Sequence, residues 1–501
     1  MKNKTGVCRA LLLVGMGLMI PCYLFTAGNT LLSPWPLYDR NRLALCLLTP
    51  LCLLLLLLLG RAAKAKVFET HERAVLLGFA SFYFVIQLVM ASALRFTPVT
   101  DLEQCVTAAR RLAQTGAFGD SERSLIYFGR YPHNMGLVYL LAGIFKAADA
   151  LGADELMAAA LVCGLLFSMG LLCAARLCCR LGGAQAQARA LLLFATCLPF
   201  LYCTSELYTD AFSVAFAPMI VFAFLKARDA GSRKERSLWA LLFAVCTFFG
   251  AQIRFPTIIA AIACLIATLF EKRAKLMALL AAPLALVFAV GGSAVNAANK
   301  ANLGAANIAQ NKLPKLHYIA MGLPVQSDEG YGQYGYGGWL IFSTSFDDPQ
   351  ARDEALRQEV VDRAYTLAHH PAQLLSTLSR KNLSTFGRGT FNLNEIFEAD
   401  AHEADNAVKQ AVFENGRFNR AYTHLATAMF VAQMALACIA CIQAIRRRDT
   451  RAAPLFLTLL GAFLFLSIWE TRARYFFQFM MILLCAGAMF ETPSTHAAQK
   501  A

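Results

Sequence analysis

The chain has 501 residues, of which 58% are hydrophobic and 16% are charged. These figures exclude a disordered chain, a collagen-like fibre and a small disulfide-stapled secreted domain, because those classes need low hydrophobicity, a glycine period or a short cysteine-dense sequence. The composition predicts an all-α polytopic membrane protein that acts as an enzyme, a transporter or a structural subunit. The excess of 46 Lys+Arg over 32 Asp+Glu is then a determinant of orientation in the bilayer rather than of nucleic-acid binding.

Apolar stretches long enough to cross a bilayer as helices recur along the chain. The first follows a basic start, Lys2, Lys4 and Arg9, and it is too long for a signal peptide and lacks a cleavage site, so we expect a signal anchor. About twelve spans are predicted, at residues 7–27, 43–60, 75–94, 156–175, 189–203, 211–225, 238–251, 256–270, 276–295, 421–444, 454–469 and 475–490. The apolar segment 135–148 is too short for a span and is predicted to be re-entrant or interfacial.

Basic residues gather in the short connections between these spans, for example at 226–236, 272–275 and 446–451. Because short cytoplasmic loops carry the excess of Lys and Arg, these clusters and both termini are predicted to lie in the cytoplasm of a multi-pass plasma-membrane protein, which we expect to be bacterial. The same topology places two large segments, 95–133 and 296–420, on the extracytoplasmic side.

The predicted organisation has four parts. They are an N-terminal transmembrane hairpin (1–74), a transmembrane core (75–295) that includes the outer loop 95–133, a large extracytoplasmic segment (296–420) and C-terminal transmembrane helices (421–501). Within the third part, a helix-like stretch runs from Asp348 to about Ser384 and is interrupted at His370-Pro371, because the residue before a proline disfavours helical geometry.

The first outer segment opens with an amphipathic stretch, TPVTDLEQCVTAARRLAQTG. Thr100 and Glu103 have the spacing of a capping box, which predicts a helix that starts there. Asp101 has two interpretations: an acid that complements the helix dipole, or a general base that takes the proton of an acceptor hydroxyl in glycosyl transfer.

A second acidic group lies in TSELYTD, where Glu206 and Asp210 are four residues apart and share one side of a helical turn. Two carboxylates beside a membrane need a cation, a substrate hydroxyl or a basic partner, unless they are solvated acids of an interfacial loop. Between the two acidic groups, the stretch YFGRYPHNMG concentrates polar side chains at a predicted boundary: Arg130, Tyr131, His133 and Asn134. They are interfacial anchors or binding-site residues.

Arginines mark two other outward turns. Arg254 interrupts two apolar runs, and Arg472 and Arg474 follow the last long run but one. The planar guanidinium fork suits a phosphate, although Glu470 offers a local salt-bridge partner. These arginines are therefore candidates for holding a lipid phosphate.

The loop PVQSDEGYGQYGYGGWL contains a formal GxGxxG at Gly330, Gly332 and Gly335, but no strand precedes it and no helix opens after it, so a dinucleotide site is rejected. Its aromatic residues, Trp339 among them, are predicted to lie over sugar rings or at the lipid surface. The sequence has no GxxxxGK, HExxH or GxSxG, so it contains none of the usual motifs of nucleotide hydrolysis, zinc proteolysis or serine hydrolysis.

Taken in order, these pieces resemble the GT-C membrane glycosyltransferases, particularly the bacterial relatives of protein O-mannosyltransferases and aminoarabinose transferases in glycosyltransferase family 39. The resemblance covers most of residues 75–490. It rests on Asp101, the YPHN boundary (131–134), the acidic turn with Glu206 and Asp210, the MGL-to-GGW segment (321–339), the RKN to GRGTF stretch (380–391) and the E-to-ARY turn (470–475).

The resemblance implies a GT-C-like bundle and an inverting transfer from a polyprenyl-phosphate-linked sugar to a protein, lipid or cell-wall glycan acceptor. Asp101 is implied as the base and Arg254, Arg472 and Arg474 as the lipid-phosphate ligands. Glu206 and Asp210 are implied to bind substrate hydroxyls, or a divalent cation if one is used; no other cofactor is expected. The sequence departs from the pattern in its extra hairpin, 7–60, and in Leu102, where some members have a second acid.

The alternative is a transporter or a flippase for lipid-linked sugars, which also has many spans and intramembrane charges. That function calls for charges within the spans and paired half-helices. Here the acids lie outside the predicted spans, in large and unequal loops, which favours the enzyme. A structural subunit of a membrane assembly is the third hypothesis.

Overall fold

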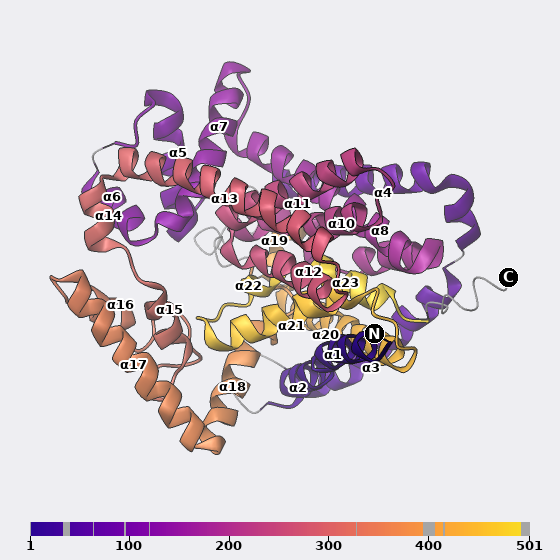
Figure 1. Cartoon of the computed structure of the whole chain (residues 1–501). Helices are drawn as coiled ribbons and strands as arrows, with labels where there is room; N and C mark the ends of the chain where they lie inside the picture. The colour runs from indigo at the N-terminus through magenta and orange to yellow at the C-terminus, as the bar shows by residue number, and fades with distance from the viewer. Residues whose placement is uncertain are drawn as a thin grey trace.

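The computed structural model describes residues 2–33, 41–63, 65–94, 97–119, 121–326, 328–393, 406–413 and 416–491. All regular structure in these residues is helical, as the composition predicts. Long apolar helices form a bundle, and shorter helices gather at one end of it, toward the left in Figure 1.

Eight helices in the described residues are long and apolar enough to cross a membrane, which confirms the multi-pass architecture. They are Gly6–Leu32 (α1, Lys2–Gly17, with α2, Met19–Leu32), α3 (Arg42–Ala62), Glu69–Leu94 of α4 (Ala65–Leu94), α8 (Glu155–Ala195), Thr209–Asp229 (α9, Thr209–Ser213, with α10, Phe216–Asp229), α11 (Arg233–Ile253), α13 (Ala274–Leu303) and α20 (Asn419–Arg446). Two shorter apolar helices are α12 (Ile258–Phe270, after the 3-10 turn η4, Phe255–Thr257) and α21 (Ala453–Ile468). The count of twelve spans stays a prediction.

The predicted span 189–203 is not one helix in the structure. α8 bends sharply at Gly183, whose φ of 75° is open to glycine without steric cost. The second limb ends at Ala195, and the chain continues as 3-10 turns, η2 (Leu198–Leu201) and η3 (Cys203–Ser205). Buried non-helical backbone of this kind is tolerated at a membrane only where protein or a polar cavity surrounds it.

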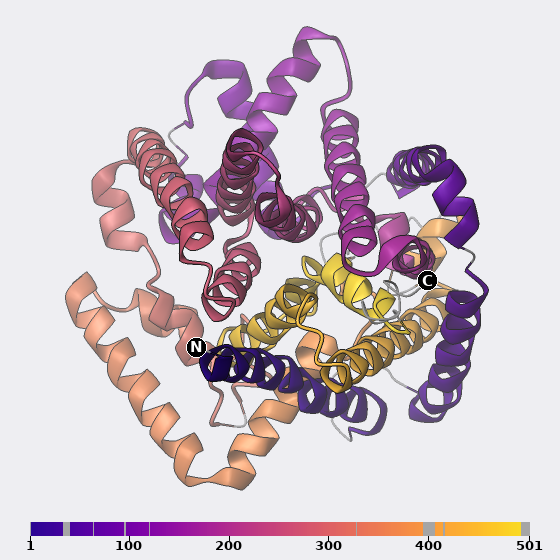
Figure 2. The ribbon, with the colours of Figure 1, turned by 45° about the vertical axis from the view of Figure 1, so that its right-hand side comes forward.

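The last predicted span, 475–490, consists of two short helices, α22 (Arg474–Phe477) and α23 (Met480–Ala488). Every residue of α23 is buried, because α8, α20 and α21 pack around it. Figure 2 shows the N-terminal helices, in indigo, packed against the yellow C-terminal helices, where α1 and α2 contact α20 and α21. A helix enclosed by protein does not need the length of a lipid-exposed span.

The short helices at one end are α5 (Thr100–Thr115), α6 (Glu122–Arg130), η1 (Pro132–Asn134), α7 (Met135–Ala150), α14 (Ala305–Asn311), α15 (Lys315–Gly322), α16 (Trp339–Thr344), α17 (Pro349–His369) and α18 (Pro371–Phe386). A further short helix, α19 (Ala407–Val412), packs on α4 and α20. We call the end with α5–α7 and α14–α18 the loop end, and the opposite end, where the connections 226–236, 271–275 and 446–451 lie, the basic end. The predicted interfacial segment 135–148 is α7, which packs against α5 and α8.

Two local predictions at the loop end have opposite outcomes. The break at His370 is confirmed: α17 ends at His369 and α18 starts at Pro371, while the Asp348 side chain caps α17 by accepting from the Gln350 and Ala351 amides. The capping box is wrong, because Val99 is the N-cap of α5 and Thr100 has a φ of 53° with no capping bond from its side chain.

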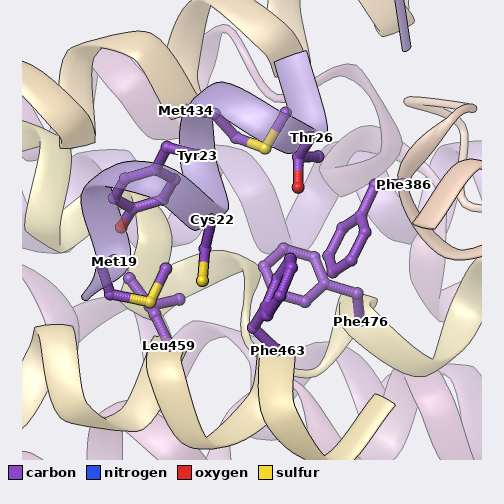
Figure 3. Close-up of a pocket in the computed structure, with 9 residues that line it drawn as sticks. All are labelled: Met19, Cys22, Tyr23, Thr26, Phe386, Met434, Leu459, Phe463 and Phe476. Carbon is purple, nitrogen blue, oxygen red and sulfur yellow. The ribbon is translucent and has the colours of Figure 1, made fainter. Parts of the chain in front are cut away.

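A small apolar cavity lies between α2, α20 and α21 and is closed by Phe386 and Phe476 (Figure 3). Aromatic, aliphatic and sulfur-containing side chains make up most of its wall, including Cys22 and Met434. This composition is that of a packing void, so the polar chemistry must be sought elsewhere.

Candidate functional site

Four charged residues from distant segments meet at the loop end. They are Asp101 at the start of α5, Asp210 in α9, Arg254 after α11 and Arg474 at the start of α22. We call them the charged cluster. Each stands where a helix begins or ends, and consecutive spans bring these termini to the same end of the bundle.

Asp210 is the centre of the charged cluster. Its side chain is fully buried, and its two carboxylate oxygens face Arg254 Nη1 at 3.1 Å and Arg474 Nε at 3.5 Å. Arg254 Nη1 also donates to Thr209 Oγ1 at 2.5 Å. A buried carboxylate requires such partners, since an unpaired charge in a low-dielectric interior is very costly.

Arg254 reaches Asp210 because the chain leaves the helix at this residue. α11 ends at Ile253, and Arg254 is extended, with φ −150° and ψ 107°, immediately before Phe255-Pro256. Pro256 has no amide hydrogen to donate to the Gln252 carbonyl, and its ring crowds that carbonyl, so α11 cannot continue through this proline.

Asp101 lies at the open side of the charged cluster. Its Oδ1 accepts from the Tyr127 hydroxyl at 2.8 Å, and that hydroxyl in turn accepts from Asn134 Nδ2 at 3.0 Å. Its Oδ2 lies 3.9 Å from Arg474 Nη2, and the side chain is 44% exposed. A small molecule at the surface can therefore reach this carboxylate.

Tyrosine rings hold the two arginines of the charged cluster. The Arg254 guanidinium lies 4.4 Å from the ring centroid of Tyr475, and that of Arg474 lies 5.3 Å from the ring of Tyr208. The Tyr475 hydroxyl donates to Glu470. Cation–π contacts of this kind stabilise a guanidinium that has lost part of its water.

Glu206 is a buried neighbour of Asp210. The residue is 1% exposed, and burial, with the neighbouring Asp210 carboxylate, raises its pKa well above the ordinary value. Glu206 and Asp210 are therefore both enclosed by protein, and neither carboxyl is open to a sugar hydroxyl. Asp210 between two guanidinium groups is also a poor ligand for a divalent cation, and no group of three or more His, Cys, Asp or Glu with metal-binding geometry occurs in the described part of the chain.

The glycine-rich loop supports the turn that precedes Arg474. The Thr471 amide donates to Gly332 O at 2.8 Å, and Thr471 Oγ1 donates to Tyr331 O at 2.8 Å. Arg472 Nη2 donates to Tyr334 O at 3.2 Å. Arg472 therefore ties the turn to the loop, whereas Arg474 points into the charged cluster.

A buried lysine fastens the same turn from the other side. Lys381 Nζ donates to Trp469 O at 2.6 Å and to Gly322 O, which joins α18, α15 and the segment after α21. Burial lowers the pKa of Lys381 to about 7. Burial also raises the pKa of Glu470 to about 7, against the lowering effect of Arg472, Arg474 and Arg254.

The remaining predicted residues lie at different distances from the charged cluster. The Tyr131 and Tyr334 hydroxyls are 2.9 Å apart, and the exposed His133 ring lies 6.1 Å from that of Tyr131. Arg130 is half-buried at the end of α6, where its carbonyl accepts from the Leu313 amide.

Trp339 belongs to a different environment from the one predicted. It is 6% exposed and packs with Met321 and Leu356 in a small apolar core of the loop end, with the Arg363 guanidinium 4.5 Å from its ring. The structure therefore gives Trp339 a packing role and not an exposed sugar platform.

The chain matches the sequence pattern of a family described as conserved hypothetical integral membrane protein, over residues 42–495. The chain belongs to this family. All members of the charged cluster fall inside the matched range of this integral membrane family. No curated protein and no solved structure matches the chain.

Proposed function

We propose that this integral membrane protein is a glycosyltransferase that moves a sugar, with inversion, from a polyprenyl-phosphate-linked donor to an acceptor hydroxyl. The observation that carries the proposal is the partly exposed Asp101 carboxylate beside Arg474, which shares the buried Asp210 with Arg254. A base and a cationic phosphate site at one membrane boundary are the two elements that such a transfer requires.

Asp101 has the role of general base. Its Oδ2 takes the acceptor proton while the acceptor oxygen bonds to the anomeric carbon from the face opposite the leaving group. Tyr127 holds the other oxygen, Oδ1, and so fixes the direction of the carboxylate. The bond between the anomeric carbon and the phosphate oxygen breaks, and its electron pair leaves with the lipid phosphate.

Arg474 and Arg254 have the role of stabilising the departing phosphate. Both guanidinium groups are largely buried, with 12% of each side chain exposed, so their charges are screened less than those of surface arginines. Before the reaction, the negative charge of Asp210 neutralises one of the two positive charges. The phosphate that leaves the sugar neutralises the other. Preorganised charges that need no rearrangement are the strongest form of electrostatic catalysis.

The reaction is proposed for the extracytoplasmic side, because the positive-inside rule assigns the basic end to the cytoplasm. In this orientation the lipid chain of the donor stays in the outer leaflet, and the acceptor approaches Asp101 from outside.

The test is transfer of labelled sugar from a panel of polyprenyl-monophosphate sugars by purified protein in lipid nanodiscs, with a crude envelope extract as acceptor. Transfer by the wild-type protein and none by Asp101→Asn, with both eluting as folded protein, supports the proposal and identifies the donor. Turnover that is the same in Asp101→Asn removes Asp101 as the base.

A transporter or lipid-linked-sugar flippase is the second candidate. The irregular backbone after α8, with buried Glu206 and Asp210 at its end, favours it, because transporters place ionisable groups at interrupted helices. No transfer from any donor, together with movement of a fluorescent lipid-linked sugar across vesicles, would support this function in place of the enzyme.

A further inference from the structure

The junction of α17 and α18 carries an exposed apolar stripe. Val361, Tyr365 and Leu375 are 55%, 65% and 60% exposed, and Leu374 is 36% exposed. Val361 and Tyr365 are one helical turn apart on α17, so they share a face, and the two leucines follow in the first turns of α18. We call residues 361–375 the elbow.

The charge of this region changes along the chain. The first part of α17, residues 349–362, contains four acids: Asp353, Glu354, Glu359 and Asp362. Residues 363–386 contain no Asp or Glu, so Asp362 is the one acid of the elbow, and they carry Arg363, His369, His370, Arg380 and Lys381. A tyrosine and aliphatic side chains beside an excess of basic residues are typical of a segment at the interface of a bilayer, whose surface is often anionic.

Hydrogen bonds place α18 at the level of a membrane boundary. Asn29 Nδ2 donates to Ser379 O at 2.5 Å, Ser379 Oγ donates to Asn29 Oδ1 at 2.6 Å, and Asn382 Nδ2 donates to Thr26 Oγ1 at 2.8 Å. Asn29 belongs to the last turns of the span Gly6–Leu32. Leu375 precedes Ser379 by four residues, which is a rise of about 6 Å along α18.

The helix that packs against α18 also exposes apolar side chains. On α2, Leu24 and Leu32 are 63% and 67% exposed, which is the exposure expected of a span that contacts the bilayer. In Figures 1 and 2 the tip where α17 meets α18 projects past the bundle on the side of α2. An apolar tip beyond the edge of the spans lies over the lipid headgroups and not over protein.

We infer that the elbow rests on the surface of the bilayer, with Tyr365, Leu374 and Leu375 in contact with lipid. The elbow then holds α15–α18 at a fixed height above the membrane. Lys381 of α18 binds the segment before Arg474, so the contact with the bilayer also fixes the position of the turn that supports the charged cluster. The inference concerns a lipid contact and does not depend on the proposed glycosyl transfer.

Photo-crosslinking tests this contact in the membranes in which the protein is made. p-Benzoylphenylalanine replaces Leu375 in one variant and, as the matched control, Glu354 on the acidic part of α17, whose side chain is 70% exposed. After illumination we expect several-fold more phospholipid adduct from position 375 than from position 354. Equal adducts at both positions, or an adduct of position 375 mainly with a second copy or another protein, would overturn the inference.

A second measurement needs no crosslink. Leu375→Trp and Glu354→Trp are compared in nanodiscs of phosphatidylethanolamine and phosphatidylglycerol, with and without brominated acyl chains. Bromine is expected to quench the added emission of Leu375→Trp and to leave that of Glu354→Trp unchanged, after subtraction of the parent signal. Both positions are exposed, so neither change disturbs the core, and unquenched emission from Leu375→Trp contradicts the lipid contact.

Discussion

The two ends of the bundle use charge in different ways. At the basic end, the acids of the ion pairs are partly exposed and the pairs are often local: Arg228 pairs with the adjacent Asp229, which is 39% exposed, and Arg451 with Asp449, which is 29% exposed. At the loop end, Asp210 is fully buried and joins Arg254 and Arg474 from distant segments. Exposed pairs contribute little to stability, whereas a buried cluster persists only when every charge has a partner. The difference indicates that the loop end is built to hold charges in fixed positions.

The largest expected difference between the ends is in stability. Asp210→Asn keeps the shape of the side chain but removes the buried anion that two largely buried arginines share, so we expect a loss of about 3–5 kcal/mol in the free energy of unfolding. Asp229→Asn at the basic end, where the carboxylate is 39% exposed and Arg228 also faces Glu271 at 3.9 Å, should cost less than about 1 kcal/mol. Thermal unfolding of both variants in the same detergent measures this difference, and equal losses would remove the contrast.

The next effect concerns the use of the donor. Arg474→Lys keeps the charge but loses the guanidinium fork and with it one charge-assisted hydrogen bond to the phosphate. Such a bond is worth about 1.5–3 kcal/mol, so the donor KM should rise roughly ten- to a hundredfold. The acceptor KM should not change. Arg451→Lys is the control from the basic end and should leave both constants unaltered. A change confined to the acceptor KM contradicts the phosphate role of Arg474.

A smaller effect follows from the pKa of Glu470, which burial raises to about 7 from an ordinary value of 4.5. The folded protein then holds a proton that the unfolded chain has released, so this group makes the stability fall as the pH rises from about 4.5 through 7. Glu470→Gln should flatten the dependence of the melting temperature on pH in this window. Glu354→Gln, on the exposed face of α17, should keep the wild-type slope; an unaltered slope in Glu470→Gln contradicts the assignment.

The sequence predicts the placement of the charged cluster, because the order of the spans and of the basic connections assigns each helix terminus to one end of the bundle. Asp101, Asp210, Arg254 and Arg474 are all found in this way, and the break at His370-Pro371 follows from proline geometry. Their partners are not predictable by the same reasoning. Tyr127, Tyr208 and Tyr475 resemble ordinary boundary tyrosines, and only the packing of α5, α9 and α22 shows which charge each one contacts.

Other features depend on contacts that no local pattern contains. Gly183 lies in a small-residue stretch, so its bend in α8 is not distinct from a tolerated helical glycine in the sequence. Trp339 lies in a glycine-rich loop that suggests exposure, yet Met321 and Leu356 bury it. Thr100 and Glu103 fit a capping box, but the backbone at Thr100 has the opposite sign of φ.

The smallest effect tests that backbone. Thr100 is β-branched and has a φ of 53°, a region that costs such a residue energy and costs glycine little. Thr100→Gly is therefore expected to preserve stability or raise it by about 0.5–1 kcal/mol. In the same helix, Thr115→Gly should lower stability, because Thr115 Oγ1 donates to Arg111 O. A clear loss of stability in Thr100→Gly would show that this threonine does cap α5.

The most direct test of the account is the ratio of single-turnover transfer rates of Asp101→Asn and Glu103→Gln, measured with the same donor in the same nanodiscs. The two acids lie in the first turn of one helix, and only Asp101 contacts Tyr127 and Arg474. We expect Asp101→Asn to be slower by about 10²–10⁴, the usual contribution of a general base, while Glu103→Gln transfers at the wild-type rate. Equal rates in the two variants would contradict the role of Asp101 as the base.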